Sequence, residues 1–134
     1  HTVDAGKSEL ILHQRYQKNA EALQERYPYT ADIYFAISDN YKREAEYERR
    51  HAQIWPELKQ LLSENGVYDY SIYWDKDTNI LFGYQEVEGE ANSQDAEAAD
   101  EITRKWWDYM ADIMEVNPDN SPVTVPIQEV FHLD

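Results

Sequence analysis

Residues 46–58 read EYERRHAQIWPEL, and the chain is organised around this stretch. At about 100° per residue, Tyr47 and His51 stand one above the other on one face of a predicted helix. The apolar side chains that follow continue this face as a stripe roughly 100° wide. They are Ile54, Leu58, Leu61 and Leu62. We therefore predict a helix that turns a tyrosine and a histidine toward the interior.

The predicted helix runs from about Tyr41 to Glu64, and Asn65-Gly66 is a favourable C-terminal cap. Pro56 lies inside this span. Because proline removes a backbone donor and crowds the preceding turn, we expect a kink or a restart there. The interruption would fall just beyond His51.

Two segments precede this helix. Residues 1–30 are predicted to form an amphipathic helix with Ser8 as a candidate N-cap, and Pro28 is expected to end it. From Asp32 the pattern changes to the alternation typical of a strand. The apolar positions of that strand are Ile33, Phe35 and Ile37. Ser38-Asp39-Asn40 is expected to end it.

Three more elements are predicted downstream. Residues 67–87 alternate as a hairpin around a turn at 75–79. A second amphipathic helix follows. Its apolar stripe is Ile102, Trp106, Tyr109, Met110 and Ile113, with Trp107 at the edge. Residues 123–133 are predicted as a last strand, in which Pro126 marks an edge or a bulge. The order strand, helix, strand, strand, helix, strand predicts an α+β, ferredoxin-like (split βαβ) protomer.

Such a protomer leaves one face of its sheet uncovered. Both helices would cover one face of a four-stranded antiparallel sheet, so the other face needs a partner. Pairing with a second copy, sheet to sheet, is the simplest solution. We therefore expect a homodimer.

Composition excludes several classes of function. The chain has 134 residues, which suits one domain, and a formal net charge of −15. Its 12 basic residues stand against 27 acidic ones, which argues against nucleic acid and anionic lipid as partners. Without cysteine it has no thiol nucleophile and no thiolate metal site. No apolar run approaches the roughly 20 residues of a membrane span.

A few residues could carry chemistry. His51 could exchange a proton at neutral pH, although a single histidine on an apolar face is more often a packed core residue. Tyr47 could be its phenolic partner or a packed ring, and Trp106-Trp107 could be core or a platform for a sugar ring. Arg49-Arg50 reads as a solvated face, with Glu46 pairing with Arg50. No histidine has the spacing of a zinc motif, so we expect no metal.

Four blocks of the sequence carry a resemblance to a known family. They are EYERRHAQIWPEL at 46–58, YDYSIYWDKDTNILFGYQEVE at 68–88, KWWDYMADIM at 105–114 and NPDNSPVTVPIQEVF at 117–131. These blocks resemble the L-rhamnose mutarotase family. The similarity runs from about Ile33 to Leu133, with the blocks in the right order and spacing. Together the four are far more specific than any one of them.

The resemblance implies a fold, an activity and a site. It implies a dimeric α/β barrel with a ferredoxin-like protomer, which interconverts the α and β anomers of L-rhamnopyranose without a cofactor. By their positions in the motifs, His51 corresponds to the family's proton donor. Tyr47, Tyr70, Trp106 and Trp107 correspond to its sugar-binding residues.

The chain departs from the family pattern at its start, where about 30 extra residues lead in. We therefore expect an N-terminal helical extension over 1–30 and the mutarotase domain over 31–134. The expected substrate is L-rhamnose or a related 6-deoxy sugar. The expected location is the cytoplasm, with an exported form left open.

Two other functions remain open from the residues alone. A cofactor-free monooxygenase of the same fold would use a similar pocket for an aromatic substrate. A non-catalytic sugar-binding or dimerisation module would use the same tryptophans and tyrosines without needing an ionisable group.

Overall fold

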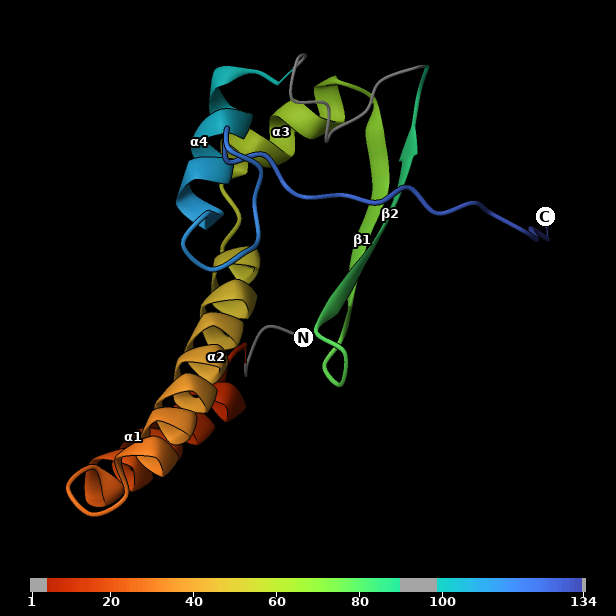
Figure 1. Cartoon of the computed structure of the whole chain (residues 1–134). Coiled ribbons are helices and arrows are strands. Elements are labelled where there is room, and N and C mark those ends of the chain that lie inside the picture. The colour runs from red at the N-terminus through yellow and green to blue at the C-terminus, as the bar shows by residue number, and fades with distance from the viewer. Residues whose placement is uncertain (1–4, 90–98, 134) are drawn as a thin grey trace. The chain divides into compact units, whose positions relative to one another are not determined.

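A computed structural model of the protein describes residues 5–89 and 99–133. Among these residues it contains four helices and one two-stranded antiparallel sheet, a small α+β fold (Figure 1). The chain forms two compact units, residues 1–93 and residues 94–134. The first unit holds α1, α2, α3 and the β1–β2 hairpin, and the second holds α4.

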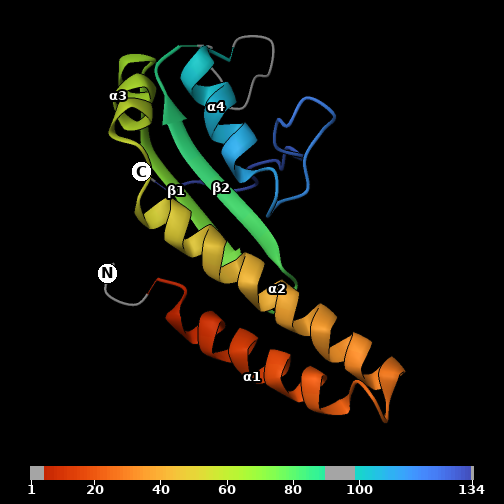
Figure 2. The same ribbon diagram turned by 90° about the vertical axis from the view of Figure 1, so that its left-hand side faces the viewer.

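A helical hairpin opens the first unit. α1 (Lys7–Leu23) and α2 (Pro28–Ala52) run antiparallel, side by side (Figure 2). Pro28 occupies the first turn of α2, where its missing N–H leaves no bond unmade. Pro28 follows the end of α1, as predicted, and it also begins α2. The prediction of Ser8 as N-cap is wrong, because Gly6 takes that position with a φ of 75°.

Small residues repeated every seven positions on α2 let α1 approach closely. Gly6 faces Ala45, and His13 faces Ser38, whose hydroxyl donates to the His13 carbonyl over 2.9 Å. Ala20 and Ala31 are both fully buried. A seven-residue repeat keeps one stripe of a helix facing its partner over its whole length. The stripe includes three positions of α2: Ala31, Ser38 and Ala45.

The predicted strand around Ile33–Ile37 is therefore wrong, because these residues lie in the middle of α2. Tyr16 of α1 packs its ring 5.6 Å from the rings of both Tyr34 and Tyr41. Those two tyrosines are seven residues apart, which only a helix places on one face. Ile33 is 61% exposed, so the alternation of apolar residues does not describe a buried strand face.

The predicted restart at Pro56 is confirmed. α2 ends at Ala52, and α3 (Pro56–Glu64) begins with Pro56 in its first turn. Asn65 and Gly66 end α3 as predicted, and Gly66 has a φ of 75°, which glycine adopts without strain. α3 packs on the following strand.

The hairpin is also confirmed. β1 (Val67–Asp75) pairs with β2 (Ile80–Val87), and Asp75 opens the turn by accepting from the Thr78 hydroxyl over 2.7 Å. Asn79 closes it in the left-handed region, with a φ of 58°. The register shifts between Tyr68 and Ser71, where Asp69 has a φ of 48°. This bulge interrupts the regular alternation that the sequence predicted.

The second unit is built on α4 (Glu101–Met110), which confirms the second amphipathic helix. Asp100 caps it by accepting from two backbone N–H groups. Residues 123–133 have no regular secondary structure, so the predicted last strand is wrong. The described residues thus hold two strands, and not the four of a ferredoxin-like sheet.

Candidate functional site

His51 lies in the last turn of α2, and its tautomer follows from one contact. Its Nδ1 is 3.1 Å from the backbone carbonyl oxygen of Tyr47. A carbonyl oxygen can only accept, so Nδ1 carries the proton and donates it. In the neutral ring the lone pair is then on Nε2. The orientation suits a base that accepts a proton through Nε2.

The Tyr47 ring packs against this imidazole. The two ring centroids are 4.2 Å apart, which confirms that the two side chains share one helix face. Burial lowers the pKa of His51, and the bond to the Tyr47 carbonyl partly offsets the effect. Burial also raises the pKa of Tyr47 far above its usual value. At neutral pH the pair therefore consists of an uncharged imidazole and a protonated phenol.

Two residues of β1 add to this pair. Tyr70 lies close enough to Tyr47 that a negative charge on the Tyr70 oxygen would further raise the pKa of Tyr47. The Tyr70 residue is 39% exposed, yet burial around its own hydroxyl raises the pKa of that group as well. The Trp74 ring centroid lies 6.4 Å from that of Tyr47. His51, Tyr47, Tyr70 and Trp74 thus form a group in the first unit.

Sequence reasoning missed Trp74 as a member of this group. A signal was present, because Trp74 follows Tyr70 by four residues in one predicted strand and so shares its face. Its indole Nε1 donates to the Asn79 side-chain oxygen over 3.1 Å, which ties the ring to the hairpin turn.

Trp106 and Trp107 belong to the second unit and are described within it. Both are buried, with 8% and 5% of their surfaces exposed, and Trp106 packs its ring 5.8 Å from that of Tyr109. The turn after α4 is tied to the helix, because the Asn120 amide donates to Asp108 over 2.8 Å.

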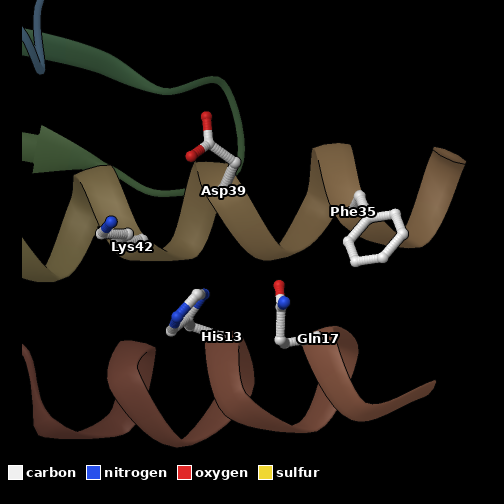
Figure 3. A pocket seen from close by; sticks show the side chains of 5 residues that line it. All are labelled: His13, Gln17, Phe35, Asp39 and Lys42. Carbon is white, nitrogen blue, oxygen red and sulfur yellow. The ribbon is translucent and has the colours of Figure 1, made fainter. Parts of the chain in front are cut away.

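An open hollow lies elsewhere in the first unit, between α1 and α2 (Figure 3). Its lining residues are His13, Gln17, Phe35, Asp39 and Lys42. None of the predicted sugar-site residues lines it. Asp39 pairs at 3.7 Å with Arg43 on the same helix. We therefore place the candidate site around His51 and not in this hollow.

The predicted pairing of Glu46 is confirmed. Its carboxylate accepts from Arg50 Nε at 3.3 Å and from Arg49 at 2.8 Å. Arg50 is only 9% exposed. The prediction that its side chain lies on a solvated face is therefore wrong. Over residues 5–89 and 99–133, no three histidine, aspartate or glutamate side chains are arranged to hold a metal ion. Nor is any helix in these ranges long and apolar enough to cross a membrane.

Comparison with known proteins decides the family. The family model described as L-rhamnose mutarotase matches residues 33–133, about three quarters of the chain. The chain belongs to the L-rhamnose mutarotase family. The match includes His51, Tyr47, Tyr70 and both adjacent tryptophans, and it leaves out α1 and the start of α2.

Individual relatives agree with this assignment. The L-rhamnose mutarotase of Bacteroides thetaiotaomicron is 74% identical over 91 residues, which cover 68% of this chain and 86% of that protein. The enzyme of the same name from Phocaeicola vulgatus is 72% identical over 91 residues, with the same coverage. A crystal structure of L-rhamnose mutarotase from Formosa agariphila has a TM-score of 0.62 and 54% identity. The matched region covers 69% of this chain and 87% of the Formosa agariphila chain.

Proposed function

We propose that this protein interconverts the α and β anomers of L-rhamnopyranose. The observation that carries the proposal is membership of the L-rhamnose mutarotase family over residues 33–133. The geometry around His51 supports it, because that family's reaction needs a group that exchanges protons near neutral pH.

Mutarotation moves two protons and forms no lasting bond to the protein. The hemiacetal opens when the anomeric hydroxyl loses a proton, the bond between C1 and the ring oxygen breaks, and the ring oxygen gains a proton. The C1 aldehyde then rotates, and the reverse steps close the ring on the other face. General acid–base catalysis of such transfers typically contributes about 10²–10⁴-fold.

We assign one of these transfers to His51. Neutral His51 accepts the anomeric proton at Nε2 as the ring opens, while solvent water supplies the proton that the ring oxygen gains. As the ring closes, the protonated imidazole is the proton donor and water takes the proton back from the ring hydroxyl. The bond from Nδ1–H to the Tyr47 carbonyl stabilises the positive charge that forms on the imidazole. A lowered pKa keeps His51 in the accepting form at neutral pH.

The remaining site residues would hold the sugar. Tyr47 and Tyr70 keep their hydroxyl protons, since their pKa values are raised, and can donate to sugar oxygens. By their positions in the family motif, Trp106 and Trp107 would supply indole faces for the apolar side of the ring and its 6-methyl group.

The proposed test is anomer exchange on L-rhamnose, followed by saturation-transfer NMR. Wild-type protein should exchange the anomers faster than buffer, and His51→Ala should lose most of that gain while keeping a wild-type circular dichroism spectrum. Exchange at the buffer rate with wild type would overturn the mutarotase proposal. Full exchange by folded His51→Ala would overturn the role assigned to His51, but not the mutarotase proposal.

The same samples separate the two other functions. Oxygen uptake with phenolic substrates would indicate a monooxygenase, and rhamnose binding without faster exchange would indicate a binding module. Family membership favours neither. Testing other 6-deoxy sugars in the exchange assay would define the substrate range.

We also propose that the protein acts as a homodimer, with residues 1–30 as an extension of the mutarotase domain over 31–134. Apolar side chains in the last segment support self-association. They are Val125 at 80%, Ile127 at 74%, Val130 at 93% and Phe131 at 78% exposed. Sedimentation at several concentrations tests the dimer, and loss of activity in a monomeric variant would connect it to function. A cytoplasmic location stays a prediction.

A further inference from the structure

Lys76, in the hairpin turn, ties three segments of the first unit together. Its ammonium group contacts the carboxylate of Glu9 on α1 and lies 2.9 Å from the carboxylate of Glu48 on α2. The other oxygen of Glu48 accepts from the Gly6 N–H over 2.7 Å, at the start of α1. Glu9 is only 6% exposed, whereas the Lys76 side chain is 53% exposed, so the pair is shielded from water on its carboxylate side. We call Glu9, Lys76 and Glu48 the latch.

The latch also contacts the candidate site. Lys76 Nζ lies 4.7 Å from the centroid of the Trp74 ring, and Trp74 packs near Tyr47. An ammonium over an indole face is attracted to it. On α2, Glu48 follows Tyr47 directly and precedes His51 by three residues. Holding Glu48 and Trp74 together therefore fixes both the helix turn and the aromatic wall beside His51.

We propose that the latch positions Trp74 and Tyr47 beside His51, so that α1 sets the geometry of the sugar site. The inference rests on the proposed function of that site. It assigns a role to α1, which lies outside the family match. Lys76 and Glu9 are positioning residues, which act on the site through Trp74 and Glu48. Because misplacement by about 1 Å can lower a rate by as much as 10²-fold, a loosened latch should be measurable in catalysis.

The test compares Lys76→Met with Lys76→Arg, which keeps the charge, and with Lys18→Met, an exposed lysine of α1. We expect Lys76→Met to lower kcat/KM for anomer exchange about three- to tenfold, and to shift the Trp74 indole signal in the ¹H–¹⁵N spectrum. Lys76→Arg and Lys18→Met should stay within about twofold of wild type. Melting curves confirm that each variant is folded at the assay temperature.

Glu9→Gln provides a second measurement on α1 if Lys76→Met fails to fold. It should reproduce the fall in kcat/KM, and adding it to Lys76→Met should have little further effect because both break one contact. A purely structural latch would lower the melting temperature and leave kcat/KM of the folded protein unchanged. That result, or an equal loss in Lys18→Met, would overturn the proposal. Exchange at the buffer rate by wild type would instead count against the mutarotase function.

Discussion

The imidazole of His51 donates its Nδ1 proton to the backbone carbonyl of Tyr47, one helical turn earlier, over 3.1 Å. This bond selects the tautomer of the neutral ring and leaves Nε2 as the proton acceptor. The centroid of the Tyr47 ring lies 4.2 Å from the centroid of the imidazole. Burial lowers the pKa of His51. One helix turn thus provides both the proposed base and the group that orients it.

Anomer exchange should depend on the neutral form of His51. We expect kcat/KM to be constant at high pH and to fall as the pH drops through a midpoint below 6.5, the ordinary value, because burial lowers this pKa. Exchange rates measured across the pH range, after subtraction of the buffer rate, check this. A midpoint above 6.5 would contradict the assignment, and the residual rate of His51→Ala should lack the midpoint.

Folding stability should change with pH in the same direction. The unfolded chain binds a proton on His51 more readily than the folded chain, so the folded state gains relative stability as the pH rises. The contribution of His51 should be complete above about 6.5 and be lost as the pH falls through the lowered folded pKa. Urea unfolding of wild type and His51→Ala at several pH values isolates this contribution.

Removal of the Tyr47 hydroxyl should weaken sugar recognition more than folding. We expect Tyr47→Phe to lower kcat/KM about three- to tenfold, the worth of one hydrogen bond, because the raised pKa keeps the phenol a donor. Tyr73→Phe is the matched control, since Tyr73 is 64% exposed on β1. Equal effects of the two changes would contradict a specific role for Tyr47.

The contact between α1 and α2 should not tolerate a methyl group at Gly6. A Cβ there would lie 2.5 Å from the Ala45 carbonyl oxygen, and the φ of 75° strains any other residue. Gly6→Ala should lower the free energy of unfolding by about 1–3 kcal/mol. Ser8→Ala should change it by less than about 0.5 kcal/mol, because Ser8 is exposed and does not cap α1. Urea unfolding of both variants makes the comparison.

The cap of α4 should be measurable in the second unit. Asp100 accepts from the N–H groups of Ile102 and Thr103 at 2.8 and 2.9 Å. Asp100→Ala should cost about 1 kcal/mol of stability, whereas Asp100→Asn should keep most of it. Thermal unfolding of both variants tests this, and equal losses would show that the cap bonds are not what stabilises the helix.

The helical state of residues 32–38 has a direct spectroscopic signature. Their ¹³Cα chemical shifts should all lie on the helical side of random-coil values, and their amides should exchange slowly where α1 covers them. Strand-like shifts would contradict the packing of Ser38 against His13. No substitution is needed for this measurement.

Local features of the sequence predicted much of the fold. The hairpin at 67–87, the restart at Pro56 and the end of α3 at Asn65-Gly66 depend on turn residues and proline, whose effects act within a few positions. The pairing of Tyr47 with His51 follows from helical spacing alone. Family membership, too, was indicated by motifs that can be read directly from the chain.

Only the tertiary structure decided the remaining features. Ile33, Phe35 and Ile37 alternate as in a strand, but the small residues at 31, 38 and 45 become a helix face because α1 supplies a matching face. Residues 123–133 alternate too, yet a strand needs a neighbour to bond with, and local pattern does not provide one. The contact of Lys76 with Glu9 joins residues 67 positions apart, which no short-range spacing predicts.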